Sequence, residues 1–294
     1  MPDEPGLAGA GSVAGGEPRD PAGAYPARSN VAGLAPVERT RHRWAAMTQR
    51  APEPAVRFDH VAIAVPRVAA VPPFLVGTLG GRAHGTGPGA GFRFWQWEFA
   101  RGARLEILEP DGPPDGFLHR FLQQRGPGIH HATFKVPALQ EAVRRAESHG
   151  YQVVGFDDRT PFWKEAFLHP KQAQGIVVQL AEVHPELEPE PSDEWTFPAA
   201  PSRPPRPADL LGLRLQARSG DAARGLWEEV LLGRCAQEGA ELVFRWPESP
   251  LRISVGVEPA GPPGPRGVEV APRPGLALPE GPHPVLGTAF LPPG

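Results

Sequence analysis

Four side chains at repeat-related positions are the best candidates for chemistry in this sequence. His60 and His131 each lie near the start of an alternating apolar run, 71 residues apart (131 minus 60). Near the same offset, Glu106 corresponds to Gln179. Alternate side chains of a strand share one face, so the four converge in a cleft if the two copies pack about a local twofold axis. Two imidazoles, a carboxylate and an amide oxygen suit a divalent transition metal with open positions for a ligand.

Each of these residues also has a simpler explanation. A lone histidine on a strand is usually a polar residue satisfied by its neighbours, and a glutamate such as Glu106 is usually solvated. The metal hypothesis is favoured because both copies place one donor on the first strand and another on the last. The adjacent His130 points to the opposite face by strand alternation, so we predict a structural role for it.

The elements that position these residues predict an α+β fold of paired β-α-β-β-β modules. The first copy, 57–110, combines alternating strand patterns with a short helical pattern, and the second copy, 129–183, repeats the order. Apolar residues at helical spacing between 111 and 128 predict a connecting helix.

Composition divides the chain into five parts. The 294 residues include 40 prolines and 35 glycines, which are concentrated toward both ends. We therefore expect a disordered segment at 1–54, a compact domain at 55–184, a Pro-rich linker at 185–208, a degenerate third module at 209–270 and a Pro/Gly-rich tail at 271–294.

Charge and hydropathy limit the classes of partner. The net charge of -3 gives no basic footprint for nucleic acid, and the apolar runs are too short to cross a bilayer. The single cysteine, Cys235, has no intrachain disulfide partner, and residues 1–30 lack the apolar core of a signal peptide. A cytoplasmic protein that acts on a small molecule is the expectation.

Four motifs resemble the vicinal oxygen chelate superfamily, and most closely its methylmalonyl-CoA epimerase branch. They lie at 59–65, 105–110, 128–131 and 167–171, within a resemblance that covers roughly 57–183. The resemblance implies two paired modules that form a cup around one metal, with His60, Glu106, His131 and Gln179 as the ligands. It also implies a substrate that chelates the metal through adjacent oxygens.

The sequence departs from the epimerase pattern at two points. Glu106 and Gln179 reverse one common arrangement of the glutamine and glutamate ligands. The glutamate assigned as an acid/base in some epimerases is replaced by Phe94. Gln96 and Glu98 share the face of Phe94, so Glu98 points into the cup if Trp95, Trp97 and Phe99 fill the core; the alternative is that Glu98 lies at the rim.

Substrate-binding candidates lie in the second module. Thr133 and Lys135 share the face of His131, and Lys171 lies in the loop of the fourth motif. Either ammonium group could meet an anionic group of a substrate, although lysines are more commonly solvated.

The implied function is metal-assisted proton transfer next to a carbonyl. A divalent cobalt, nickel, manganese or zinc ion would stabilise an enolate while a carboxylate, Glu106 or Glu98, moves the proton. The predicted enzyme is an isomerase or epimerase of a small carbonyl or acyl thioester, or a glyoxalase-like lyase. The alternatives are an iron(II) ring-cleaving dioxygenase, which takes its carboxylate from the position of Gln179, and a non-catalytic, resistance-type binding protein.

The third module is expected to bind no metal, because Gly212 replaces His60 and Ser254 replaces Glu106. A single β-α-β-β-β unit leaves an open sheet, which a second unit must cover. We predict that it pairs with its counterpart in another chain, giving a homodimer, or docks on the first two modules. A short strand at 267–270 is the candidate start of a fourth unit.

Overall fold

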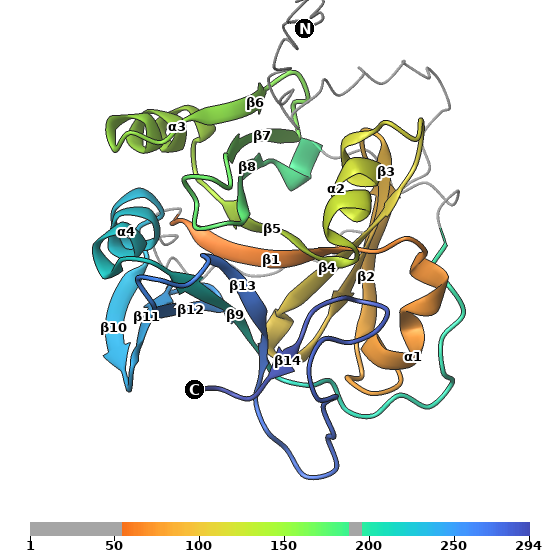
Figure 1. Ribbon diagram of the computed structural model, residues 1–294. Coiled ribbons are helices and arrows are strands. Elements are labelled where there is room, and N and C mark those ends of the chain that lie inside the picture. Colours follow the sequence, from red (N-terminus) through yellow and green to blue (C-terminus); the bar gives the residue numbers. More distant parts are fainter. Residues whose placement is uncertain (1–54, 188–195) are drawn as a thin grey trace, which may run out of the picture.

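The computed structural model describes residues 55–187 and 196–294, so the predicted disordered segment at 1–54 lies outside the described residues. Two sheets dominate this part of the chain (Figure 1). The first has eight strands in the order β2-β3-β4-β1-β5-β8-β7-β6, and the second has six in the order β10-β11-β12-β9-β13-β14. The α+β architecture of paired modules with a degenerate addition is confirmed.

The first sheet is formed by the two repeats. The first module consists of β1 (Arg57–Ala64), η1 (Val68–Ala70), α1 (Pro72–Leu75), β2 (Arg82–Pro88), β3 (Phe92–Glu98), η2 (Ala100–Gly102) and β4 (Arg104–Pro110). After the connecting helix, the second module follows as α2 (Phe117–Arg125), β5 (Gly128–Lys135), α3 (Leu139–Ser148), β6 (Val153–Asp157), β7 (Trp163–Leu168), β8 (Val177–Val183) and η3 (Pro185–Leu187). The helical pattern of the first module is shortened because Pro72 and Pro73 occupy the start of α1.

The two modules join through their first strands. β1 runs antiparallel to β5, while each also pairs in parallel with the last strand of its own module, β4 or β8. The pairing of β1 with β5 contains two bulges, in which Asp59 and His130 are the extra residues. Bulges redirect the side chains beside them, and both of these directly precede a candidate ligand histidine.

Strand alternation separates a core face from a cup face. Val61, Ile63, Trp95 and Trp97 are buried in the main core, as expected for the face away from the cup. On the cup face, a separate apolar cluster brings α2 onto the sheet. It comprises Ala62, Ala64, Leu108 and Leu118 with flanking aromatic residues. Helix α2 therefore covers one end of the cup.

The second sheet repeats the strand order of the first. It contains β9 (Leu210–Ala217), α4 (Gly220–Arg224), η4 (Gly225–Val230), β10 (Arg234–Glu238), β11 (Glu241–Arg245), β12 (Arg252–Val257), β13 (Gly264–Val270) and β14 (Phe290–Leu291). β13 lies antiparallel to β9 as β5 does to β1, and β14 lies parallel to β13 as β8 does to β5. The degenerate fourth unit thus has two strands, β13 and β14, and β14 lies in the segment that was expected to be a tail.

An ion-pair network occupies the cup face of the second sheet. The fully buried carboxylate of Glu269 accepts hydrogen bonds from Arg214, Arg252 and Ser254 at 2.7 to 3.0 Å. Ser254 lies at the position that Glu106 occupies in the first sheet, in agreement with the alignment. Arginine side chains do not bind metal ions. In this cup the charge of the buried carboxylate is therefore balanced by the guanidinium groups of Arg214 and Arg252.

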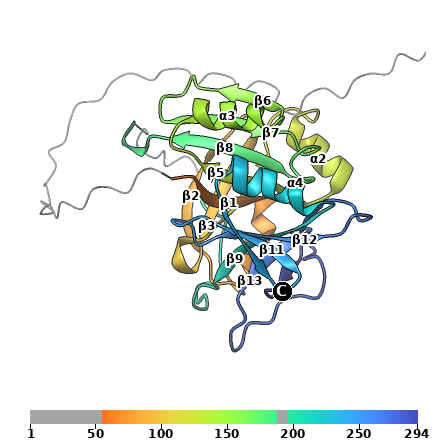
Figure 2. The ribbon, with the colours of Figure 1, turned by 90° about the vertical axis from the view of Figure 1, so that its left-hand side faces the viewer.

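The second half docks on the first within one chain (Figure 2). The rings of Phe58 and Phe134 stack at 4.8 Å, and Trp246 meets the same two rings at 5.9 and 4.8 Å. Trp227 lies 5.9 Å from Phe134. The docking alternative is therefore the one observed, and covering the third module requires no second chain.

Part of the Pro-rich segment also contacts the first module. Thr196 accepts a hydrogen bond from the Trp95 indole at 3.1 Å, and Phe197 meets the ring of Trp97 edge-on. The backbone of Ala208 forms hydrogen bonds with the backbones of Leu79 and Ala100.

Among the described residues, no helix has both the length and the apolar character needed to cross a bilayer.

Glu182 gives a pH-dependent test of how helix α3 is anchored to the sheet. Its carboxylate accepts hydrogen bonds from the Leu139 backbone N–H at 2.7 Å, from Lys164 at 2.6 Å and from His184 at 2.8 Å. Burial acts to raise the pKa of Glu182, but these bonds prevail and lower the pKa from 4.5 to about 2. Because the folded pKa is the lower one, the stabilisation is complete above pH 4.5 and is lost as the pH falls toward about 2.

We expect Glu182→Gln to reduce the free energy of unfolding by about 1.5 to 3 kcal/mol at pH 7, the usual contribution of a hydrogen bond to a charged group. Urea unfolding at pH 7, 4 and 3 should show the difference from wild type shrinking with acidity. A difference that stays constant over this range would contradict the role of the ionised carboxylate.

Candidate metal centre

His60 is held by the bulged residue before it. Its Nδ1 lies 2.9 Å from Asp59 Oδ2, and the side chains of both residues are almost fully buried. Asp59 in turn accepts a hydrogen bond from Arg104 at 2.6 Å and lies 3.3 Å from the Lys135 ammonium. A carboxylate at Nδ1 fixes the ring and directs Nε2 to the opposite side, which is the arrangement found behind histidine ligands of metals.

His131 is held in the same way by a different partner. Its Nδ1 lies 2.9 Å from Nδ1 of His130, the second bulged residue, so Nε2 again points away from that partner. His130 rests against the rings of Phe117 and Phe121 on α2. The bulge thus breaks the alternation: His130 lies beside α2 on the cup side, not on the opposite face that regular strand geometry predicts.

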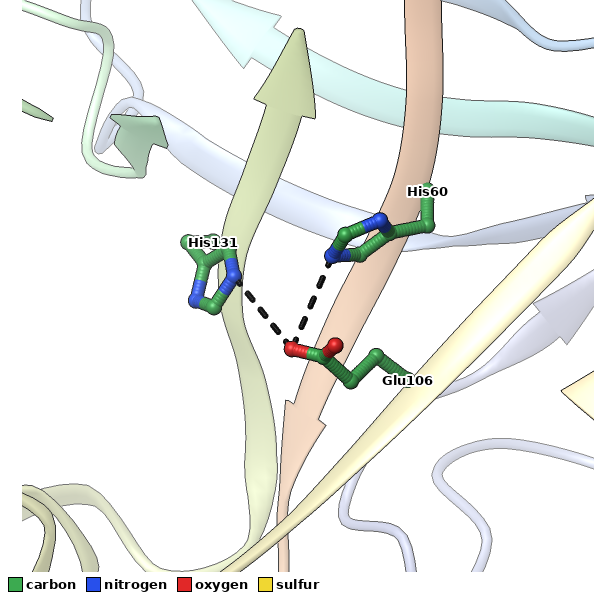
Figure 3. A group of neighbouring side chains, drawn as sticks. All are labelled: His60, Glu106 and His131. Atoms are coloured by element: carbon green, nitrogen blue, oxygen red, sulfur yellow. Dashed lines mark ion pairs between the residues drawn. The ribbon is translucent and has the colours of Figure 1, made fainter. Parts of the chain in front are cut away.

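Glu106 faces both histidines (Figure 3). Its Oε1 lies 3.6 Å from His60 Nε2 and 3.7 Å from His131 Nε2. Its other oxygen, Oε2, accepts a hydrogen bond from Gln96 Nε2 at 2.8 Å. Gln96 lies directly opposite Glu106 in the pairing of β3 with β4, so the neighbouring strand sets the direction of the carboxylate.

Thr133 and Gln179 complete the cluster. The Thr133 hydroxyl donates to Gln179 Oε1 at 2.6 Å and lies 2.9 Å from His60 Nε2. Gln179 Nε2 donates to Glu165 Oε2 at 2.7 Å. The structure therefore links Gln179 to His60 through Thr133, which was predicted only as a substrate-binding residue.

The pKa values of the two histidines are shifted in opposite directions. Burial acts to lower the pKa of His60, but Glu106 and Asp59 more than offset it and raise the pKa to about 9. Burial, with the nearby His130 and His60, holds the pKa of His131 well below its usual range. Burial likewise lowers the pKa of His130 to about 4, against the opposing influence of Glu106. His131 and His130 are thus neutral near pH 7.

These residues fit a divalent cation. The donor atoms of His60, Glu106 and His131 all lie within 4.8 Å of one another. Among the described residues, this is the one group of three or more histidine, cysteine, aspartate or glutamate donors arranged in this way. His131 Nε2 is buried and makes no hydrogen bond. A buried polar atom without a hydrogen bond is costly, and here that nitrogen is a lone-pair donor aimed at a carboxylate and a second imidazole.

The other predicted site residues lie farther out. Glu98 is on the cup-face row of β3, but its side chain is 40% exposed and lies 3.5 Å from His84, which places it at the rim. Lys135 is engaged by Asp59 behind His60. Lys171 is exposed in the loop between β7 and β8.

Three residues around the candidate ligands were not predicted: Asp59, Gln96 in its bond to Glu106, and Glu165. Asp59 carried a signal, because it corresponds to His130 at the same offset of 71 that relates the ligand histidines (130 minus 59). Gln96 and Glu165 reach the site across strand pairs, where no sequence spacing reveals the contact.

A model of the glyoxalase/bleomycin resistance protein/dioxygenase superfamily matches residues 59–167. Over these residues the chain matches that superfamily, in agreement with the resemblance to the vicinal oxygen chelate class that its four motifs indicate.

Individual relatives cover the chain to different extents. The protein YqjC of Bacillus subtilis (strain 168) is 32% identical over 91 residues, which are 28% of this chain, and the chain spans 60% of the length of this relative. The structure of methylmalonyl-CoA epimerase from Mycobacterium tuberculosis is 27% identical, with a TM-score of 0.41, and the match covers 44% of this chain and 89% of that one.

A third similar structure is a mutant of 4-hydroxymandelate synthase from Streptomyces coelicolor. It is 14% identical with a TM-score of 0.52, and the match covers 74% of this chain and 71% of that one. At this identity the likeness shows the fold alone. A match of this extent reaches beyond the first sheet and supports the description of the second sheet as a further copy of the fold.

Proposed function

We propose that the first sheet carries a metal-dependent active site that moves a proton on carbon next to a carbonyl. The observation that supports this most directly is the buried set of His60, Glu106 and His131, with an unbonded Nε2 on His131. Co²⁺, Ni²⁺, Mn²⁺ or Zn²⁺ suits nitrogen and oxygen donors of this kind. The substrate is a small carbonyl compound or acyl thioester, and the reaction is an epimerisation, an isomerisation or a glyoxalase-like lyase step.

The cation, when bound, would supply Lewis acidity to the substrate oxygens. The residues of the chain then have separate roles. His60, Glu106, His131 and the Gln179 oxygen hold the cation, while Ala62 and the rest of the apolar cluster under α2 keep water from one side of the cup.

The carboxylate that moves the proton is proposed to be Glu98 or Glu106. Glu98 lies on the cup-face row of β3, two residues from Gln96, and its position at the rim leaves it accessible to a substrate. Glu106 has one oxygen on the two histidines and the other on Gln96, which suits a ligand better than a base. Thr133 and the exposed Lys171 are proposed to contact the substrate.

A ring-cleaving dioxygenase is the second candidate, and one observation favours it. Two histidines and one carboxylate are also the ligand set of non-haem iron(II) oxygenases. In this chain the carboxylate comes from Glu106 in the first module, with Gln179 at the position from which such dioxygenases take it. A resistance-type protein that binds a small molecule without catalysis is the third candidate.

Metal analysis of the purified protein, combined with solvent exchange, tests the proposal. Near-stoichiometric cobalt, nickel, manganese or zinc is expected, together with deuterium uptake from D₂O at the α carbon of an acyl-CoA thioester such as methylmalonyl-CoA. Iron with consumption of O₂ would favour the dioxygenase. Ligand binding with neither metal nor exchange would favour the non-catalytic protein.

The role of Glu98 has its own variant. We expect Glu98→Gln to keep the metal and to slow the exchange by at least about 100-fold, the usual contribution of a general base. Glu147→Gln, the same change at an exposed position of α3, is the matched control and should alter neither quantity. Undiminished exchange in the Glu98 variant would remove this residue from the mechanism.

A further inference from the structure

Glu165 is a buried carboxylate next to the proposed metal ligands, and the proposed chemistry leaves it without a role. It lies on β7 and is 7% exposed. Its Oε2 accepts hydrogen bonds from Gln179 Nε2 and from the Trp163 indole N–H, both at 2.7 Å. Burying a carboxylate is costly even when it is hydrogen-bonded, so an apolar residue would serve better at this position if packing were the only requirement.

The contact with Gln179 settles which end of the amide faces the ligand cluster. A carboxylate only accepts hydrogen bonds, so it binds the NH₂ group of Gln179 and repels the amide oxygen. The Thr133 hydroxyl donates to Gln179 Oε1 from the other side. Only the oxygen of an amide can bind a metal cation, and the two partners together direct that oxygen to the Thr133 hydroxyl, which itself lies 2.9 Å from His60 Nε2.

The first module also orients its inner side chain through a carboxylate–amide hydrogen bond, but with the two groups exchanged. Glu106 faces the histidines and its partner on the neighbouring strand is the amide of Gln96, at 2.8 Å. In the second module the amide of Gln179 faces the site and the carboxylate of Glu165 lies on the neighbouring strand. Each module thus contributes one carboxylate and one amide, with the inner and outer positions exchanged.

We propose that Glu165 is a positioning residue that fixes the amide of Gln179 with its oxygen toward the bound metal. The proposal rests on the proposed metal site. A carboxylate at position 179 would need no such partner, because its two oxygens are equivalent. An amide needs one, because half of its orientations present hydrogens to the cation.

Metal affinity in a double-mutant cycle tests this, with Co²⁺ and Ni²⁺ titrations as the readout. We expect Glu165→Gln and Glu165→Leu to weaken binding about 10- to 100-fold, the usual effect of losing an outer-shell partner. In the background of Gln179→Glu two carboxylates face each other, so the change Glu165→Gln should not weaken binding, because it replaces a repelled carboxylate with an amide that can donate a hydrogen bond to the carboxylate introduced at position 179. The Co²⁺ absorption spectrum should change in the Glu165 single variants, because the amide oxygen of Gln179 is then no longer held in one orientation.

The controls separate this role from a loss of folding and from failure of the metal site itself. Glu182→Gln, on the same strand as Gln179 but outside the cup, should reduce stability and leave metal affinity unchanged. Equal loss of affinity from Glu165→Gln in both backgrounds, or unchanged affinity in Glu165→Leu, would overturn the positioning role while leaving the proposed function intact. A wild-type protein that binds no divalent metal would overturn both.

Discussion

Replacing His60 or His131 with alanine is expected to abolish stoichiometric metal binding, with a loss of affinity of at least about 100-fold. Each imidazole supplies a buried nitrogen within 4.8 Å of the other donor atoms, and alanine offers no replacement. Metal content after dialysis, measured by elemental analysis, checks the result. His149→Ala is the matched control, because His149 lies at the end of α3 and pairs with Glu229 at 3.4 Å on the outside of the fold.

The neighbouring His130 gives a graded result in the same experiment. Its Nδ1 contact with His131 makes it a partner of a ligand and not a ligand, so we expect His130→Ala to weaken binding about tenfold and to retain the metal. Full metal content in both the His60 and His131 variants would refute the assigned centre. Loss of metal from His149→Ala would show that the effect is one of folding.

Trp246→Ala is expected to lower the free energy of unfolding by about 3 to 5 kcal/mol, the range for removing a large aromatic side chain from a packed core. Trp246 is 2% exposed and meets the rings of Phe58 and Phe134 where the second half docks on the first. Its indole N–H also donates to the backbone oxygen of Leu231 at 2.6 Å. Urea unfolding followed by circular dichroism measures the change.

Phe156→Ala is the matched control for this variant, because Phe156 is an aromatic residue that is 41% exposed. We expect its effect to stay within about 0.5 kcal/mol. If Trp246→Ala proved equally mild, or if two separate unfolding transitions were present in the wild type, the two halves would not share one cooperative core. The common cluster of buried residues predicts a single transition.

The two cups differ in the source of the positive charge that faces their buried carboxylates. In the first sheet, buried donors surround a position that suits an external cation. In the second sheet, Arg214 and Arg252 supply positive charge from the chain itself and bind the carboxylate of Glu269. One metal ion per chain is therefore the stoichiometry that the two cups predict.

The fold and the clustering of His60, Glu106 and His131 could be predicted from the sequence for a physical reason. A strand places alternate residues on one face, and duplicated modules place equivalent residues around a twofold axis. The offset of 71 residues between the two copies and the two-residue alternation of a strand were therefore enough to predict that His60 and His131 lie close together. The same period assigned Trp95 and Trp97 to the core, where they are buried.

Only the tertiary structure decided which residues surround the proposed ligands. The bulges at Asp59 and His130 depend on how β1 and β5 pair, so alternation gave the wrong face for His130. Glu165 reaches Gln179 diagonally across the pairing of β7 with β8, and Glu98 ends at the rim beside His84. Local periodicity fixes which face a side chain takes, but its partner on another strand depends on register, which is set only when the strands pair.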